Sequence, residues 1–212
     1  MRVASEDIDI HEGIRRVEAY ARRFPRTLEI FDGIGQVELV EADPDRVTLA
    51  DIGRLVVIDA QLRADDVPVL LGVDAGAQLA AVPIDAKLED ADYGGALWQA
   101  ASDLLDRFTG LEGVDRAKRS KLLHMKRPGM FFISDNRTGN AYQAVADAFS
   151  RKRGYEALGY WEAAQADIVQ PAFVELMGLL DDWRLDSDSG TLRLGHLSRV
   201  RVLDIVCWSP AA

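Results

Sequence analysis

The chain has 212 residues, of which 48% are hydrophobic and 28% charged, and its formal net charge is −10 at pH 7. This length is enough to bury one substantial core, so we expect a single compact domain over residues 1–212. No apolar run reaches the roughly 20 residues of a membrane-spanning helix, and the acidic start lacks the layout of a signal peptide. We therefore expect a cytoplasmic protein without membrane contact, in which the lone Cys207 is a core residue.

The N-terminal part of the chain predicts short helices with one ambiguous segment. Residues 12–24 repeat apolar side chains at helical spacing. Residues 27–40 are glycine-punctuated and β-branched, which favours a loop or a small strand pair. A helix is predicted over residues 48–62, although the run 55–58 also fits a strand. Prolines and glycines over residues 64–91 indicate short helices joined by tight connections.

The C-terminal part predicts longer helices. An apolar stripe is clearest over residues 93–108, and Pro128-Gly129 ends the helix that follows. A polar loop is expected over residues 187–195. The remaining predicted helices cover residues 114–127, 139–152, two stretches within 156–183 and 198–208. The predicted fold class is all-α, with a small strand pair near the N-terminus as the expected β structure.

Common enzyme signatures are missing from the sequence. It has no glycine-rich phosphate loop and no nucleophile elbow. Its three histidines are scattered, and a single cysteine cannot complete a zinc site with them. We therefore expect no cofactor and no metal.

Charge is distributed unevenly along the chain. Residues 116–153 hold ten Lys and Arg against two acids, a net charge of +8, so the remainder holds 15 basic and 33 acidic residues, a net charge of −18. The overall acidity opposes indiscriminate binding to nucleic acid. The local excess predicts an anion-facing surface, unless the basic segment packs beside acidic helices of its own fold.

A helix over residues 93–108, the turn Leu111-Glu-Gly-Val114 and a second helix follow one another, with the hairpin at about residues 109–117. This layout resembles the helix-hairpin-helix of the DNA glycosylase superfamily, and the direct match covers about 25 residues, with flanking helices compatible with that fold. In that superfamily a Leu-Pro-Gly-Val-Gly turn presents backbone N–H groups to a DNA phosphate. The resemblance implies an all-α glycosylase-like fold. It also implies that Asp135, which follows the turn at the typical spacing, is the catalytic carboxylate.

The sequence also departs from the glycosylase pattern. Glu112 stands where the turn has proline, and Asp115 stands where it has its second glycine. Bifunctional members of the superfamily carry a catalytic lysine in the second helix, and Ala117 stands at the equivalent position here. Monofunctional members also lack this lysine, so its absence is compatible with glycosidic cleavage. A closer resemblance is to an uncharacterised actinobacterial domain family, carried by Lys121-Leu-Leu123, Lys126-Arg-Pro128 and Ser134-Asp135. That family implies no assigned activity.

The candidate site residues each have two interpretations. Asp135 either acts on a glycosidic bond or caps the following helix. The phosphate- or ligand-binding candidates are Gly113, Lys118, Lys121, Lys126 and Arg127, whose charged side chains also fit a solvated helix face. The aromatic candidates for a base-stacking pocket are Trp98, Tyr142 and Trp161, which also fit the core.

Two functions from different classes follow from these interpretations. The first is a diverged glycosylase-like protein that binds nucleic acid or a nucleoside-like ligand through residues 116–153 and cleaves an N-glycosidic bond. The second keeps the same fold as a non-catalytic scaffold or partner-binding module. The spacing of Asp135 favours the first function. The acids in the hairpin favour the second.

Overall fold

Helices make up most of the protein. The computed structural model describes residues 1–34, 43–153, 156–187 and 190–209. The α-helices are α1 (Ile10–Arg23), α2 (Leu49–Val57), α3 (Asp66–Leu71), α4 (Gly76–Ala81), α5 (Ala96–Arg107), α6 (Arg116–Lys126), α7 (Asn136–Arg153), α8 (Glu156–Ile168), α9 (Pro171–Asp181) and α10 (Arg199–Trp208). Single turns of other helix types are η1 (Thr27–Phe31), η2 (Leu88–Asp90) and η3 (Leu194–His196).

Two antiparallel strand pairs accompany the helices. The first joins β1 (Arg2–Val3) to β2 (Glu6–Asp7) at the N-terminus. The second joins β3 (Arg184–Ser187) to β4 (Gly190–Arg193), with Leu185 opposite Leu192.

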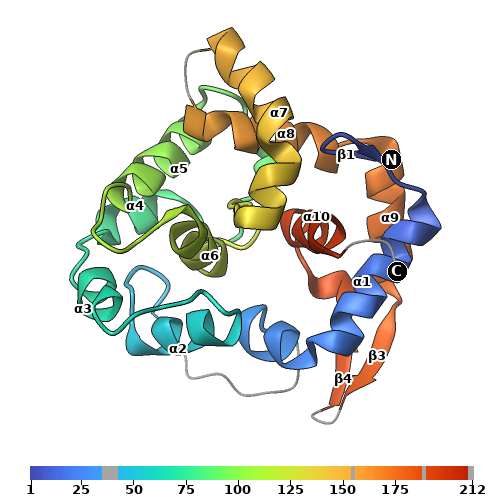
Figure 1. Cartoon of the computed structure of the whole chain (residues 1–212), viewed down its shortest axis with the longest axis horizontal. Helices are drawn as coiled ribbons and strands as arrows, with labels where there is room; N and C mark the ends of the chain where they lie inside the picture. The colour runs from blue at the N-terminus through green and yellow to red at the C-terminus, as the bar shows by residue number, and fades with distance from the viewer. Residues whose placement is uncertain (35–42, 154–155, 188–189, 210–212) are drawn as a thin grey trace.

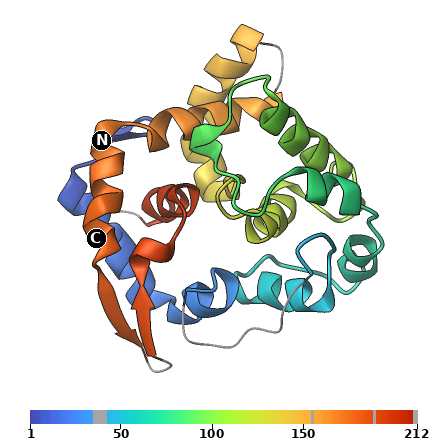
Figure 2. The same cartoon turned by 180° about the vertical axis from the view of Figure 1, so that it is seen from behind.

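Two helices, α6 and α10, lie at the centre of the molecule. In both views the other helices surround them (Figures 1 and 2). Seven of the ten residues of α10 and eight of the eleven residues of α6 are buried. A helix enclosed in this way must bury polar side chains as well as apolar ones, and each buried polar group then needs a partner within the chain.

Capping residues start several helices where the sequence predicts them. Thr48 and Asp51 form a reciprocal capping box at the start of α2, so residues 55–58 belong to this helix and its end rather than to a strand. Ser198 accepts a hydrogen bond from the Arg201 N–H at the start of α10. Pro171 occupies the first turn of α9. The helices predicted in the C-terminal part are therefore confirmed, with small differences in their ends.

The loop or strand pair predicted at residues 27–40 is wrong for residues 27–31, whereas residues 32–34 form neither helix nor strand, in agreement with a loop. Residues 27–31 form the π-type turn η1, and residues 35–40 of the predicted segment lie outside the described residues. Arg54 of α2 donates hydrogen bonds to the carbonyl oxygens of Ile30 (3.0 Å) and Phe31 (2.5 Å). These carbonyl groups therefore have a side-chain donor instead of a neighbouring strand.

The polar loop predicted at residues 187–195 is also wrong where the structure describes it, and residues 188–189 lie outside the described residues. This segment contributes to the β3–β4 hairpin and then forms η3. Leu185 and Leu192 are buried together on one face, and the Thr191 hydroxyl donates to Asp186 on the other strand at 2.9 Å. A cross-strand apolar pair stabilises a hairpin whose remaining residues are polar.

None of the described helices is both long and apolar enough to cross a membrane.

Candidate functional site

A cleft beside the N-terminal end of α7 contains the carboxylate of Asp135. Its inner cavity has a volume of about 160 Å³ and its outer cavity a volume of about 430 Å³. Both linings include Asp135, Lys121, Trp208 and residues 58–59. We call the two cavities together the Asp135 cleft.

Asp135 caps α7 with one carboxylate oxygen. Its Oδ1 accepts hydrogen bonds from the N–H groups of Arg137 (2.8 Å) and Thr138 (3.1 Å) and from the Thr138 hydroxyl (3.1 Å). Within the part of the chain that the structure describes, no hydrogen bond reaches Oδ2, and the side chain is half-buried. Capping therefore leaves one oxygen of this carboxylate available to a ligand.

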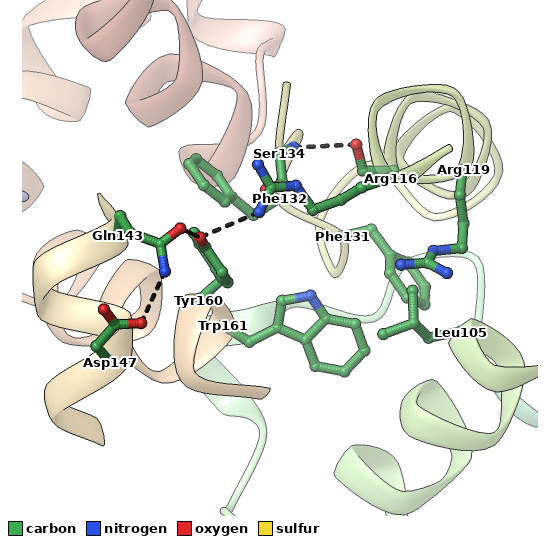
Figure 3. Close-up of a pocket in the computed structure, with 11 residues that line it drawn as sticks. Leu105, Arg116, Arg119, Phe131, Phe132, Ser134, Gln143, Asp147, Tyr160 and Trp161 are labelled. Atoms are coloured by element: carbon green, nitrogen blue, oxygen red, sulfur yellow. Dashed lines mark hydrogen bonds between the residues drawn. The ribbon is translucent and has the colours of Figure 1, made fainter. Parts of the chain in front are cut away.

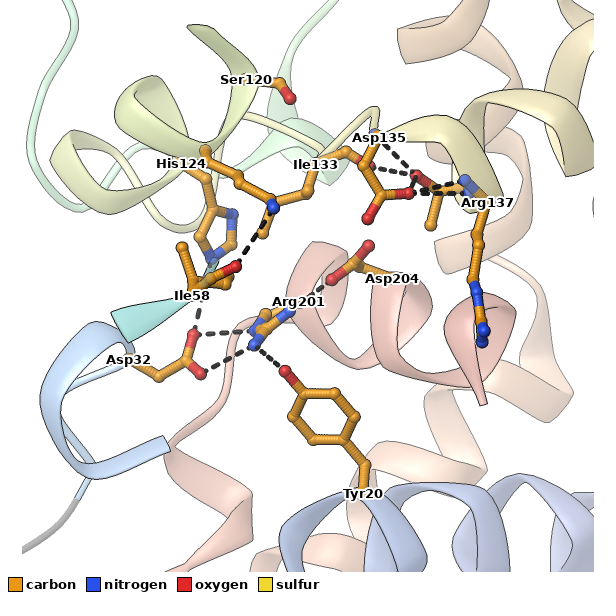
Figure 4. Close-up of polar contacts among 12 residues, drawn as sticks. Tyr20, Asp32, Ile58, Ser120, His124, Ile133, Asp135, Arg137, Arg201 and Asp204 are labelled. Carbon is orange, nitrogen blue, oxygen red and sulfur yellow. Dashed lines mark hydrogen bonds and ion pairs between the residues drawn. The ribbon is translucent and has the colours of Figure 1, made fainter. Parts of the chain in front are cut away.

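Asp204 of α10 lies beside Asp135 in the inner cavity, where the two carboxyl groups approach each other (Figure 4). Burial raises the pKa of Asp204 to about 7; the guanidinium of Arg201 opposes this rise and the negative charge of Asp135 adds to it. Oδ2 of Asp204 accepts a hydrogen bond from Arg201, whereas Oδ1 is buried and has no partner among the described residues. Near neutral pH, Asp204 can therefore hold a proton next to Asp135.

Arg201 organises the floor of the cleft. Its guanidinium donates to both carboxylate oxygens of Asp32, at 2.8 and 3.0 Å, and to the Tyr20 hydroxyl at 2.9 Å. It also lies over the rings of Tyr20 and Phe31, at 5.2 and 5.6 Å from their centroids. Arg201 and Asp32 are both buried, so this hydrogen-bonded floor forms a rigid base for the Asp135–Asp204 pair.

His124 of α6 lies beside the same network, with its Nε2 3.9 Å from Oδ1 of Asp32 (Figure 4). Its Nδ1 lies 2.7 Å from the Phe131 carbonyl oxygen, and its ring stacks on Phe31 with 5.9 Å between centroids. Burial lowers the pKa of His124 to about 3, and the charge of Arg201 adds to the lowering. The imidazole is therefore neutral at physiological pH, with Nδ1–H donating to Phe131.

Lys121 brings a positive charge to the lining of both cavities. Its ammonium group donates to the carbonyl oxygens of Ile58 and Asp59, each at 3.2 Å, and no carboxylate pairs with it among the described residues. The loop that it holds contains Asp59 and Gln61 in the left-handed region, at φ values of 52° and 50°. Non-glycine residues adopt this conformation at a cost of roughly 1–3 kcal/mol, and such residues concentrate at functional sites.

Aromatic side chains form one wall of the inner cavity. Tyr20, Phe24 and Trp208 contact one another with ring centroids 5.0 to 5.6 Å apart. Arg137 lies 4.5 Å from the centroid of the Trp208 ring and donates to the Trp208 carbonyl oxygen at 3.0 Å. The cleft therefore combines an aromatic wall with a carboxylate pair.

Three of the four cations predicted to contact a phosphate are engaged inside the protein. Lys118 and Lys126 are each 5% exposed and Arg127 is 2% exposed. Their carboxylate partners are Asp66, Asp51 and Asp45, respectively. Backbone carbonyl groups accept the other hydrogen bonds of these side chains. Lys121 is the one of the four that lines the Asp135 cleft.

Gly113, the remaining ligand-binding candidate, lies against an internal carboxylate. Its φ is +76°, and a Cβ added there would lie 2.2 Å from Oδ1 of Asp66. Its carbonyl oxygen accepts a hydrogen bond from Lys118 at 2.8 Å. Asp66 therefore lies beside the turn where the glycosylase resemblance places a phosphate.

The predicted pocket aromatics lie away from the Asp135 cleft. Trp98 and Tyr142 are 2% and 0% exposed, and the Tyr142 hydroxyl donates to Asp167 at 2.6 Å. Trp161 packs edge-on against Trp98 and lines a separate cavity.

Arg201 and Asp204 were not among the site residues predicted from the sequence. A detectable signal existed, because these two charges lie three residues apart within the apolar helix of residues 198–208.

These observations define a mostly helical protein with a carboxylate pair in a partly aromatic cleft. The chain belongs to a family of unknown function, DUF6308, which matches residues 14–211. The expected membership of an uncharacterised family is therefore confirmed. Comparisons with curated proteins and with solved structures found no match.

Proposed function

We propose that this protein is a diverged relative of the helix-hairpin-helix glycosylases that binds a nucleoside-like ligand in the Asp135 cleft and cleaves its N-glycosidic bond. The observation that carries the proposal is the free Oδ2 of Asp135, which faces the cleft next to the buried, readily protonated Asp204. Asp135 also follows the turn at the spacing of the catalytic carboxylate in that superfamily.

The carboxylate pair suits hydrolysis of a bond between a sugar and a base. Ionised Asp135 accepts the proton of a water molecule whose oxygen attacks the anomeric carbon, and the bonding electrons leave with the base nitrogen. The proton then passes to the departing base, so the products are a free sugar and a free base. The negative charge of Asp135 also stabilises positive charge that develops on the sugar ring.

The proposed ligand is a single nucleoside or nucleotide rather than a long nucleic acid. Lys118, Lys126 and Arg127 are engaged with internal acceptors, so they do not supply a phosphate-binding surface. Lys121 remains in the cleft as one cation beside the carboxylate pair. Aromatic side chains at the wall suit the apolar faces of a base or a sugar.

The second candidate is a non-catalytic scaffold or binding module with the same fold. It is favoured by the carboxylate of Asp66 beside Gly113 and by the helix cap that Asp135 provides, because neither requires a substrate. In this case the cleft binds a ligand without changing it.

Release of free base separates the two candidates. A panel of ribonucleosides and deoxyribonucleosides is incubated with the protein, free base is measured by chromatography, and binding is measured by thermal shift. We expect at least one nucleoside both to raise the melting temperature and to yield base. Binding without release supports the second candidate. If no nucleoside binds and none is cleaved, the proposal is wrong.

A further inference from the structure

A second cavity, of about 350 Å³, lies between α5, α6, α7, α8 and residues 131–134 (Figure 3). Its apolar lining is formed by Leu105, Phe131, Phe132 and Trp161. Trp161 is held edge-on by Phe131, with 5.2 Å between ring centroids. We call this cavity the Trp161 pocket. Its volume is within the range of small-molecule sites, about 300–1,000 Å³.

Two guanidinium groups line the Trp161 pocket. Arg116 donates to the Tyr160 hydroxyl at 3.0 Å, and Arg119 donates to the Thr109 hydroxyl at 2.7 Å. Neither arginine forms an ion pair with any residue that the structure describes. Lys118 and Lys126 on the same helix have carboxylate partners, whereas these two arginines have none among the described residues.

Buried polar atoms in the same lining also have no partner. The Ser134 hydroxyl belongs to a residue that is 7% exposed and makes no hydrogen bond with the described residues. The Nε of Arg119 is likewise buried without an acceptor. Buried polar groups are nearly always hydrogen-bonded in folded proteins, so these two groups are available to donate to a ligand with acceptor atoms.

We propose that the Trp161 pocket binds a small aromatic carboxylate. The ring of this ligand packs against Trp161 and the neighbouring apolar side chains, as aromatic ligands do in largely apolar pockets. Its carboxylate accepts a hydrogen bond from Nε of Arg119, because a guanidinium matches a carboxylate in charge and in geometry, while Arg116 and the Ser134 hydroxyl supply donors elsewhere in the lining (Figure 3). Asp147 also lines the pocket, so a ligand with one negative charge fits better than a dianion.

This site is independent of the function proposed for the Asp135 cleft. Arg116 and Ser134 line both the Trp161 pocket and the outer cavity of the cleft, and so stand between them. Leu105 and Arg119 line the Trp161 pocket and neither cavity of the cleft. Substitution of these two residues therefore tests the pocket alone.

Calorimetric titration with matched probes tests the proposal. Indole-3-carboxylate supplies the ring and the charge, whereas indole-3-carboxamide supplies the same ring without the charge. We expect saturable binding of the carboxylate and at least tenfold weaker binding of the carboxamide, since charge-assisted hydrogen bonds are about twice as strong as neutral ones.

Variants locate the binding site. We expect Arg119→Gln to weaken carboxylate binding about tenfold or more and to leave carboxamide binding nearly unchanged. Leu105→Phe narrows the pocket and should weaken both probes. The control Arg15→Gln removes an exposed arginine of α1 and should change neither affinity. Circular dichroism checks that each variant is folded. The proposal is overturned if neither probe binds, if both bind equally, or if Arg119→Gln binds the carboxylate as tightly as the wild type.

Discussion

Burial favours the neutral forms of the ionisable side chains around Arg201, Asp204 and His124 among them. It raises the pKa of Asp204 to about 7 and lowers the pKa of His124 to about 3. The same desolvation has opposite effects on the two pKa values because one group is an acid and the other a base. Arg201 and Asp32 remain as the ion pair of the network. The result is a carboxyl group that can exchange a proton near neutral pH, directly beside Asp135.

The pKa of Asp204 has a consequence for stability. The folded protein keeps the proton up to about pH 7, whereas an unfolded aspartate loses it near its ordinary pKa of 3.8. The free energy of unfolding therefore decreases as pH rises between these values, by at most about 1.4 kcal/mol per pH unit. We expect urea titrations at pH 4, 5.5 and 7 to show that the free energy of unfolding of Asp204→Asn, relative to that of the wild type, increases as pH rises. A difference that does not vary with pH would contradict this assignment.

His124 has the opposite pH dependence. Its folded pKa of about 3 lies below the ordinary histidine pKa of 6.5, so its contribution to stability is complete above pH 6.5 and is lost as pH falls towards 3. We expect nuclear magnetic resonance at pH 5 to show a neutral ring carrying its proton on Nδ1. A charged His124 ring in the folded protein at pH 5 would show that water reaches this side chain, in contrast to its burial in the structure.

At the scale of elements, α6 explains why its lysines do not form an open phosphate-binding surface. Five of its eleven residues are Lys or Arg, yet most of the helix is buried. Carboxylate and carbonyl groups of residues 43–66 accept hydrogen bonds from Lys118, Lys121 and Lys126. Charged side chains of α6 therefore join it to the segment around α2 and α3.

Breaking one of these buried ion pairs should be costly. Lys126 and Asp51 are nearly inaccessible to solvent, so Lys126→Met leaves a buried carboxylate without its cation. We expect a loss of about 3–5 kcal/mol in the free energy of unfolding. Lys87→Met, which removes an exposed lysine, is the matched control and should change stability by less than about 0.5 kcal/mol. Equal effects of the two substitutions would mean that the Lys126–Asp51 pair does not stabilise the fold.

Local signals in the sequence predicted the helices better than they predicted the site. Helix starts are marked by Thr48, Ser198 and Pro171 through effects on the nearby backbone, and such signals can be recognised from a short stretch of sequence. The β3–β4 hairpin was missed because its apolar pair is a single leucine from each strand. Packing of the basic segment against acidic parts of the same fold was one of two open alternatives, and the sequence could not decide between them because the acceptors of α6 come from residues distant in the chain. Asp135 was a candidate from spacing, whereas Asp204 becomes its neighbour only through packing of α10.

At the scale of the whole molecule, charge and burial together predict weak binding to DNA. The net charge is −10, and three of the four predicted phosphate contacts are engaged inside the fold. We expect no gel shift of duplex DNA at 150 mM salt. At lower salt, the logarithm of the affinity should fall with the logarithm of the salt concentration at a slope shallower than about −2, because each phosphate contact contributes about −0.9. A much steeper slope would reveal a phosphate-binding surface that these contacts do not explain.

The most direct test of the central claim compares Asp135→Asn with Asp9→Asn on a nucleoside that the wild type cleaves. Both aspartates cap a helix, Asp9 by accepting from the His11 and Glu12 N–H groups of α1, and asparagine caps about as well as aspartate. We expect both variants to melt within a few degrees of the wild type. Asp135→Asn should reduce the rate of base release at least a hundredfold, since positioned acid–base groups typically contribute 10² to 10⁴, whereas Asp9→Asn should retain it. Full activity in Asp135→Asn would contradict the catalytic role and leave Asp135 a helix cap.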